Sequence, residues 1–285
     1  MARVAVITDS AADLEPDEAA EAGISVVPLI VNFGSDSYRA GVDMSTEGFW
    51  DRMTAPDAPW PTTAASSPGD FREVYERAFS DGAEAIISIH VAGSLSGTIK
   101  SAEIAREMLG DREIHVVDSQ GASRAQVILA RIAVEMAAAG KPPIEIAEYL
   151  AQRASDLRMY VALETLEYLK KGGRISGTRA AIGTLLSVKP IISVEAGVVD
   201  QADRVRTRGK ARERLIELIT SRPIERLEIL HTRAPDVEAF RDEVVARLDG
   251  RFDAAAVPIG LVGASVGPHV GPGCLGAAVL YEAET

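Results

Sequence analysis

The stretch from residue 85 to residue 109 constrains the fold most, because it changes from one secondary structure to another around a single turn. Its first part, 85–91, is apolar and β-branched, which is typical of a buried strand, whereas apolar residues recur at helical spacing over 97–109. The turn between them carries three hydroxyl side chains: Ser94, Ser96 and Thr98. Because ligands of open α/β sheets lie beyond the carboxyl ends of strands, this turn is a candidate anion site. The simpler interpretation is that Ser96 only caps the helix.

The same alternation of strand and helix continues along the chain. The apolar patterns predict strands at 3–8, 24–33, 113–117, 159–163, 190–194, 198–207 and 225–231, with the last strands between 254 and 281. They predict helices at 16–22, 46–53, 68–80, 122–139, 143–156, 209–220 and 235–248, and two more that end near 170 and 187. Such alternation is typical of an α/β fold with a mostly parallel sheet covered on both faces. We expect two domains, 1–157 and 158–285, because the chain is longer than an average domain.

The composition argues against several classes of protein. With a formal net charge of −12, the chain lacks the basic character that a general nucleic-acid-binding protein needs. Cys274 is the only cysteine, so neither an internal disulfide nor a metal cluster built on cysteines can form. The N-terminal stretch 1–9, Met-Ala-Arg-Val-Ala-Val-Ile-Thr-Asp, meets a charge too soon to be a secretory signal, and we therefore expect a cytoplasmic protein.

The C-terminal stretch 254–281 carries no formal charge and is long enough to raise the question of a membrane span. Pro258, Pro268 and Pro272, together with six glycines, would interrupt a helix repeatedly. We therefore interpret this stretch as buried strands joined by a loop rich in glycine and proline.

Two patterns of reactive residues are only weak evidence for a catalytic site or a metal site. Residues 263–267, Gly-Ala-Ser-Val-Gly, match the nucleophile motif of hydrolases, but that motif requires a helix directly after Ser265. We expect the prolines and glycines that follow to prevent this helix, and the only later histidine, His269, is just four residues away. Three acidic or imidazole side chains come from separate strands without the close spacing of metal ligands: Asp9, His115 and Asp118. Capping of strand ends is the favoured interpretation of these three, and no metal is expected.

The remaining candidate ligand contacts are hydroxyls at loops and two isolated side chains. The hydroxyls are Thr8, Ser10, Thr62, Thr63, Ser94, Ser96 and Ser119. Arg174 lies in a break between glycines, and His269 lies in a loop of proline and glycine. Hydroxyl, guanidinium and imidazole groups suit a carboxylate or phosphate held by hydrogen bonds, and they supply no activated nucleophile. His269, taken alone, is better explained by a structural role.

A row of cations occupies every second position between residues 204 and 214: Arg204, Arg206, Arg208, Lys210, Arg212 and Arg214. If 204–208 is extended, its arginines share one face of a strand. One interpretation is an exposed edge strand protected by charge. The other is a docking surface for an acidic or nucleotide-bearing partner. The sequence leaves both open.

Several short stretches together resemble the DegV family. They are 8–10 (Thr-Asp-Ser), 61–63 (Pro-Thr-Thr), 93–98 (Gly-Ser-Leu-Ser-Gly-Thr), 118–119 (Asp-Ser), 172–176 (Gly-Gly-Arg-Ile-Ser), 189–191 (Lys-Pro-Ile) and 269–273 (His-Val-Gly-Pro-Gly). Each is weak alone, but they occur in the family's order over nearly the whole chain. The resemblance implies a two-domain α/β DegV-like fold. An N-terminal Rossmann-like parallel sheet and a C-terminal mixed-sheet α/β domain would enclose a ligand cleft between them.

The resemblance also implies a function. Within that family the chain is similar to the fatty-acid-binding B subunit of bacterial fatty acid kinase. This implies a lipid-binding carrier subunit that is not itself an enzyme and takes no cofactor besides its bound fatty acid. A long-chain fatty acid would lie in a deep pocket, and a separate ATP-dependent kinase subunit would phosphorylate its carboxylate. The acyl phosphate would feed phospholipid synthesis, and transient contact with a membrane is compatible with that role.

The resemblance assigns roles to individual positions near the carboxylate. The matching residues are Thr63, Ser94, Ser96, Arg174 and His269. Of the two serines, Ser94 is the expected carboxylate contact, and Ser96 is the expected turn and cap residue.

Two further assignments concern the kinase and the loop beside the head group. Arg204 and Arg206 fall where the family places basic residues that dock the kinase. The loop after Thr63 departs from the family pattern, because Ala64 and Ala65 stand where polar residues are common. We therefore expect fewer polar contacts from this loop.

For the acyl chain we expect apolar walls from 127–136, from 182–188 and from the run through Leu261 and Val262. Two rival functions stay open. One is a small-molecule enzyme that uses the cleft between the domains, either a hydrolase at Ser265 or a phosphotransferase. The other is an acidic regulatory module whose cations bind partners while its pocket stays empty.

Overall fold

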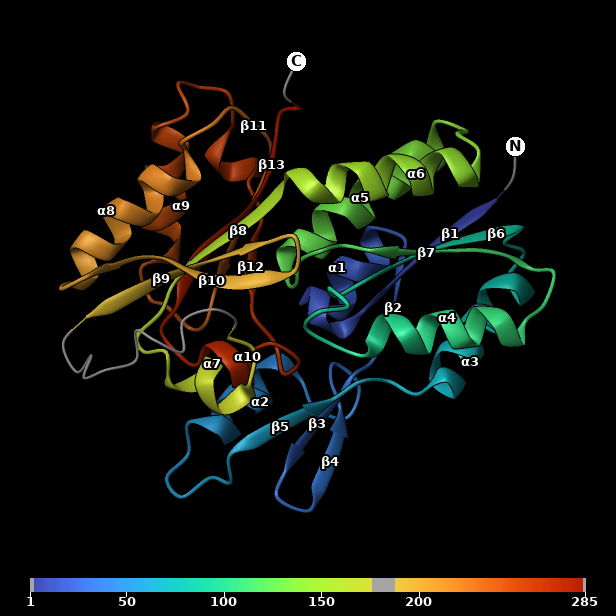
Figure 1. The fold of residues 1–285 in the computed structure, drawn as a ribbon, viewed down its shortest axis with the longest axis horizontal. Helices are drawn as coiled ribbons and strands as arrows, with labels where there is room; N and C mark the ends of the chain where they lie inside the picture. Colours follow the sequence, from blue (N-terminus) through green and yellow to red (C-terminus); the bar gives the residue numbers. More distant parts are fainter. Residues whose placement is uncertain (1–2, 176–187, 284–285) are drawn as a thin grey trace.

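The computed structural model describes residues 3–175 and 188–283. The strands are β1 (Val4–Asp9), β2 (Ile24–Val27), β3 (Ile30–Phe33), β4 (Asp36–Arg39), β5 (Pro61–Ala64), β6 (Ala85–His90), β7 (Glu113–Asp118), β8 (Leu157–Ala162), β9 (Lys189–Glu195), β10 (Val198–Val205), β11 (Ile224–His231), β12 (Ile259–Leu261) and β13 (Leu275–Tyr281). The helices are α1 (Pro16–Glu21), α2 (Thr46–Met53), α3 (Pro68–Ser80), α4 (Thr98–Met108), α5 (Arg124–Ala138), α6 (Pro143–Arg153), α7 (Glu167–Gly172), α8 (Arg208–Ile219), α9 (Val237–Ala246) and α10 (Gly267–Val270). Two large sheets lie on opposite sides of the molecule (Figure 1).

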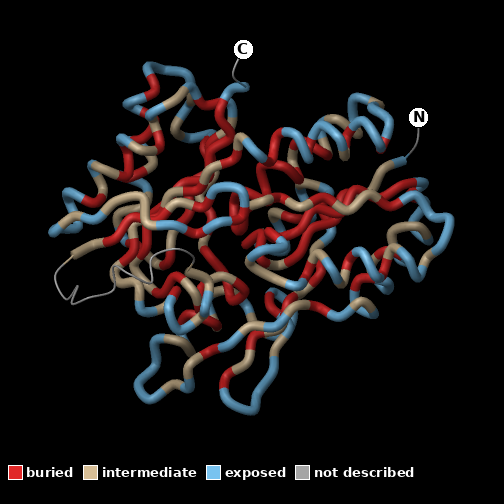
Figure 2. Tube along the Cα trace, in the orientation of Figure 1, coloured by how far each residue is buried: buried red, intermediate tan, exposed pale blue. Residues whose placement is uncertain are grey.

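The N-terminal half is built on a parallel sheet in the order β2-β1-β6-β7. All residues of β6 are buried, and neighbours along it face opposite layers. Ile86 packs in a core with α3 and α4, whereas Ile87 packs in a core with α5 and α6. Figure 2 shows the buried strands between more exposed helices. This arrangement confirms the expected Rossmann-like sheet, because an apolar strand without alternation must be covered on both faces.

The C-terminal half is built on a mixed sheet in the order β10-β9-β8-β13-β11-β12. Helices α8 and α9 cover one face of it, where Ile191 belongs to the core. The next residue, Ile192, points to the opposite face and joins an apolar cluster with residues of the N-terminal half. This face of the sheet therefore looks toward the rest of the molecule. The expected domain boundary at 157 falls at the start of β8 and stays a prediction.

The prediction of one strand over 24–33 was wrong. The run divides into β2, which pairs with β1, and β3, which pairs with β4 and β5 in a separate antiparallel sheet. Pro28 lies at the division and has no N–H to continue a ladder. Its carbonyl accepts a hydrogen bond from Ser66 Oγ at 2.7 Å. Strands β4 and β5 were not predicted from the sequence patterns, and neither was the small sheet that they form with β3.

The uncharged C-terminal stretch contains β12 and the fully buried β13, as predicted. The expectation that its prolines prevent a helix was wrong, because α10 begins two residues after Ser265. Pro268 lies in the first turn of that helix, where a missing N–H costs no hydrogen bond. Within 3–175 and 188–283, no helix has both the length and the apolar character that crossing a membrane requires. The helix expected to end near 187 lies outside the described residues.

Helix α5 connects the two halves, because it packs against β1 and β6 and also against β11 and β13. Its first residue, Arg124, is fully buried. The Arg124 guanidinium donates to Glu228 Oε2 on β11 at 2.6 Å and to Glu18 Oε2 on α1 at 3.0 Å. Gly260 makes room for it, because a Cβ at Gly260 would lie 2.4 Å from Arg124 Cδ. Burial raises the pKa of Glu228 even though Arg124 and Arg131 oppose the shift.

Removal of the Arg124 guanidinium is expected to destabilise the fold strongly. Arg124→Met leaves Glu228 buried without its closest cation, which costs roughly 3–5 kcal/mol of unfolding free energy. Arg131→Met is the matched control, because Arg131 contacts the same two carboxylates but its side chain is 36% exposed. We expect it to cost less than about 1 kcal/mol. Urea denaturation at pH 7 measures the unfolding free energy of both variants. Equal losses in the two variants would contradict a special role of buried Arg124.

Candidate functional site

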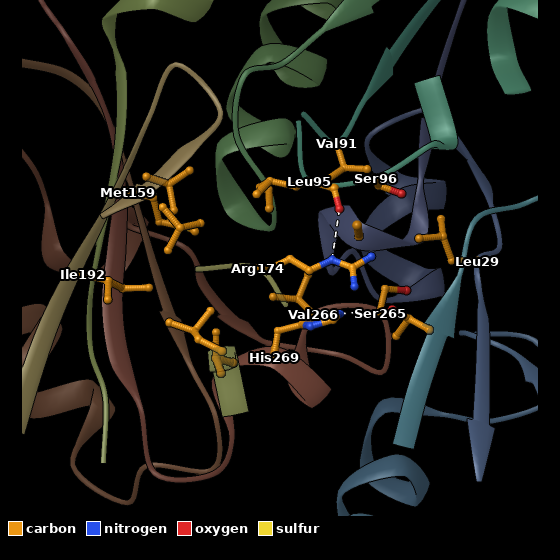
Figure 3. A pocket seen from close by; sticks show the side chains of 17 residues that line it. Leu29, Val91, Leu95, Ser96, Met159, Arg174, Ile192, Ser265, Val266 and His269 are labelled. Carbon is orange, nitrogen blue, oxygen red and sulfur yellow. Dashed lines mark hydrogen bonds between the residues drawn. The ribbon is translucent and has the colours of Figure 1, made fainter. Parts of the chain in front are cut away.

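A pocket lies between the two sheets, with about 610 Å³ of empty space when the open solvent at its mouth is included. Its lining comes from both halves of the chain: Ala11, Leu29, Thr63, Val91, Leu95, Ser96, Ala122, Met159, Leu169, Arg174, Ile192, Val194, Val199, Ser265, Val266, His269 and Val270. In Figure 3, Met159 and Ile192 approach from the mixed sheet, and Val91 and Leu95 approach from the carboxyl end of β6. The strand–turn–helix stretch at 85–109 thus forms one wall, as its position at the end of a parallel strand predicts.

The walls of the pocket are mostly apolar. Met159 on β8, Ile192 and Val194 on β9, and Val199 on β10 form one side. Period-two alternation along β9 turns Ile192 and Val194 to the pocket and leaves Ile191 in the core under α8 and α9. This alternation was the signal that sequence analysis could have used to find these residues.

The predictions for the acyl walls were largely wrong. None of 127–136 lines this pocket, because α5 turns Ile128 and Leu129 into the core between the two sheets. Leu261 packs beside the small antiparallel sheet, and Val262 lies in the apolar cluster behind the lining. The expected wall at 182–188 falls almost wholly outside the described residues.

Five of the lining residues are polar: Thr63, Ser96, Arg174, Ser265 and His269. Thr63, in the middle of β5, brings its Oγ1 to 3.0 Å from His269 Nε2 on α10. Arg174 follows α7, whose C-cap residue Gly173 adopts the left-handed conformation. The Arg174 guanidinium donates to the carbonyl oxygens of Leu95 at 3.2 Å and Gly172 at 2.7 Å. No described carboxylate pairs with it, so its charge is available to an anion.

The environment of His269 favours a neutral ring. Burial, and to a lesser degree the charge of Arg174, lowers the pKa of His269 to about 4. Its Nδ1 is buried without a hydrogen-bond partner among the described residues. Gly172 allows this close packing, because a Cβ there would lie 2.2 Å from Nδ1. A neutral ring with its proton on Nε2 donates to Thr63 Oγ1, and the Thr63 hydroxyl can then donate to a ligand.

The two serines of the turn have different surroundings. Ser96 lines the pocket, and its Oγ lies 2.8 Å from Thr98 Oγ1 at the start of α4. Ser94 Oγ instead donates to the Gly197 carbonyl at 2.5 Å, in the turn between β9 and β10. A Cβ at Gly197 would lie 2.4 Å from that hydroxyl. The assignment of the carboxylate contact to Ser94 stays a prediction.

Ser265 lines the pocket without the partners of a nucleophile. Its Oγ lies 2.8 Å from Ser10 Oγ, which accepts a hydrogen bond from the Leu29 N–H. His269 contacts Thr63 instead, and no described carboxylate orients its ring. The hydrolase motif therefore lacks a base in this geometry, although a short helix does follow it. Likewise, the described residues contain no cluster of three side chains suited to hold a metal ion.

The row of cations does not form one face. The strand ends at Val205, Thr207 caps the next helix, and Arg208 is already helical. Arg208 and Arg212 both pair with Asp236. Arg204 is exposed on β10, an edge strand, and Arg206 is exposed just after it; neither forms an ion pair with a described residue.

Comparison with known proteins identifies the family. The family model described as "Uncharacterised protein, DegV family" matches residues 3–282. The chain belongs to the DegV family. A DegV domain-containing protein of Caldanaerobacter subterraneus subsp. tengcongensis is 33% identical over 286 residues, which cover 99% of each chain. One of Streptomyces coelicolor is 34% identical over 281 residues, which cover 97% of this chain and 98% of the relative.

Solved DegV structures share the whole fold. A fatty-acid-binding DegV family protein of Thermus thermophilus has a TM-score of 0.88 at 33% identity and covers 98% of this chain and 100% of its own. DegV of Bacillus subtilis, a fatty acid binding protein, has a TM-score of 0.85 at 29% identity and covers 99% of this chain and 100% of its own. These similarities confirm the two-domain α/β fold expected from the sequence.

The neutral form of the His269 ring can be tested through the dependence of the unfolding free energy on acidic pH. Because its pKa falls from 6.5 to about 4 on folding, the unfolded chain binds a proton that the folded chain does not bind between these pH values. The unfolding free energy therefore decreases as the pH falls through this window. We expect His269→Gln to remove roughly 1–3 kcal/mol of that decrease by pH 4, measured by urea denaturation. His115→Gln, at the Glu113 surface pair, is the control. If the unfolding free energy of His269→Gln decreased with falling pH as much as that of the wild type, a neutral buried ring would be contradicted.

Proposed function

We propose that this DegV protein binds a long-chain fatty acid in the pocket and presents its carboxylate to a separate kinase subunit. The observation that carries the binding step is a mostly apolar pocket with a cation, Arg174, that no described carboxylate neutralises. Each buried methylene of an acyl chain contributes about 0.8 kcal/mol. The fatty-acid-binding DegV protein of Thermus thermophilus supports the same ligand class.

The head group is proposed to lie among Thr63, Arg174 and His269, with the two turn serines nearby. A carboxylate is costly to bury unless charged and hydrogen-bonding groups compensate it. Arg174 supplies the charge, and the Thr63 hydroxyl, oriented by neutral His269, supplies a donor. Thr63, Arg174 and His269 are all only half-buried, which leaves the carboxylate within reach of a second protein.

Presentation to the kinase is the second part of the proposal. The chain would act as a carrier without catalysis of its own, and the kinase subunit would use ATP to form the acyl phosphate for phospholipid synthesis. Arg204 and Arg206 are proposed to dock that subunit, because they are exposed and free of ion pairs with described residues. Strand β10 carries Arg204, ends directly before Arg206 and contributes Val199 to the pocket, so the proposed docking residues lie on or next to an element of the ligand site. This proposal includes a cytoplasmic location.

The first test is mass spectrometry of an organic extract from the purified protein. We expect a fatty acid in stoichiometric amount. Arg174→Met is expected to lower affinity for palmitate about tenfold, since a hydrogen bond to a charged group contributes roughly 1.5–3 kcal/mol. Arg226→Met, which removes a surface arginine paired with Glu135, is the matched control. Ser94→Ala and Ser96→Ala in the same assay decide which serine contacts the carboxylate. An empty extract, with no uptake of added palmitate or oleate, would overturn the binding proposal.

The docking step has its own test. Acyl phosphate formation, trapped as the hydroxamate, is measured with fatty-acid-loaded protein, ATP and the kinase subunit of the same organism. We expect Arg204→Glu with Arg206→Glu to raise the apparent KM for the carrier about tenfold or more, because like charges oppose docking to an acidic surface. Arg247→Glu, an exposed arginine at the end of α9, is the control. Turnover of ATP or an ester by the protein alone would favour the enzyme alternative instead.

A further inference from the structure

A chain of buried polar side chains runs from helix α3 to the end of β1. Tyr75 Oη lies 2.8 Å from Ser88 Oγ, and Ser88 Oγ lies 2.6 Å from His90 Nε2. His90 Nδ1 lies 3.0 Å from Asp9 Oδ2. All four side chains are fully buried, and Phe71 meets the His90 ring edge-on with its centroid at 4.9 Å. If Asp9 accepts from Nδ1–H, then Nε2 accepts from Ser88, and Ser88 accepts from Tyr75, so every group finds a partner.

The contacts among Ser88, His90 and Asp9 have the distances of a catalytic triad. Their burial excludes that role in this geometry. Every residue of β6 is buried, and Ser88 and His90 do not line the pocket. A nucleophile that no substrate atom can approach has no catalytic use. The role of the arrangement must therefore be sought in what the Asp9 carboxyl binds.

Asp9 holds two parts of the pocket wall. Its Oδ1 accepts from the Ala11 N–H at 2.9 Å, and its Oδ2 accepts from the Val91 N–H at 3.1 Å. Both Ala11 and Val91 line the pocket. The backbone pairing of β1 with β6 ends at Thr8 and Ile89, so the ladder itself does not fix the residues beyond. The Asp9 carboxyl thus joins two chain segments at the point where the sheet stops joining them.

We propose that Asp9 and His90 are positioning residues that set the width of the pocket between Ala11 and Val91, and thereby its preference among fatty acids. The proposal rests on the proposed fatty-acid ligand. His90 fixes the Asp9 carboxyl from behind, while Ser88 and Tyr75 fix the His90 ring. Ala11 is small and Val91 is β-branched, so the spacing between these two wall residues depends on the backbone rather than on flexible side chains.

The test compares variants along this chain of contacts. Asp9→Asn places an NH₂ group where the Val91 N–H or His90 Nδ1–H needs an acceptor. Tyr75→Phe removes only the hydroxyl at the end of the chain that is farthest from the pocket. We expect Asp9→Asn to change the ratio of the Kd values for palmitate and oleate about fivefold or more. Tyr75→Phe should leave this ratio unchanged, even where it lowers the melting temperature. A role in folding alone predicts loss of stability in both variants with an unchanged ratio, and that result would overturn the proposal.

A second readout does not depend on any ligand. Hydrogen exchange of the Ala11 and Val91 amides, relative to the most protected amides of β6, should accelerate about tenfold in Asp9→Asn and stay unchanged in Tyr75→Phe. His90→Asn retains a donor for Asp9, so the Ala11 and Val91 amides are expected to stay protected from exchange. His90→Leu lacks this donor, and its amides are expected to exchange faster. These two variants replace Asp9→Asn in the test if Asp9→Asn fails to fold. Unchanged exchange in both Asp9→Asn and His90→Leu would overturn the proposal. Absence of fatty-acid binding by the wild type, with exchange altered as expected, would overturn the proposed ligand and leave the positioning contacts established.

Discussion

The packing of helix α5 against both large sheets is the constraint on which the pocket depends. One face of this helix covers β1 and β6, and the same helix reaches β11 and β13. Buried Arg124 then fixes its start by binding carboxylates from the two halves, Glu18 and Glu228. Because the sheets are held at this separation, the carboxyl ends of β1 and β6 face the apolar side of the mixed sheet. The space that remains between them is the pocket.

The structure uses its arginines in two different ways. Arg124 is buried among carboxylates, where removal of either sign of charge is costly. Arg174 is held by the carbonyl oxygens of Leu95 and Gly172, and among the described residues its charge has no carboxylate partner. The neighbouring imidazole of His269 is kept neutral by burial. Among the described residues, the polar end of the pocket therefore offers one net positive charge in apolar surroundings, which is the electrostatic complement of a single carboxylate.

Sequence patterns predicted those parts of the fold that depend on local periodicity. The buried β6, helix α3 and the alternation of strands with helices follow from apolar spacing alone. The division of 24–33 did not, because an apolar run looks the same whether it continues in one sheet or passes from one sheet to another. The role of α5 was misjudged for a related reason. An apolar helix face indicates burial, but its sequence does not show whether it faces a cavity or a second sheet.

The site shows the same limit at the scale of single side chains. Thr63, Arg174 and His269 come from three distant segments; residue types placed them only in a wider set of candidate contacts, and the resemblance to a family narrowed that set. Ser94 and Ser96 are equivalent in sequence terms, since both are hydroxyls in one glycine-bounded turn. The turn separates them by pointing Ser94 at Gly197 and Ser96 at the pocket. Asp9 was interpreted as a strand-end cap, and it does accept a hydrogen bond from the Ala11 N–H just after β1, whereas His90 was seen only as part of an apolar run. What the sequence could not convey is that the backbone they hold is the wall of the pocket.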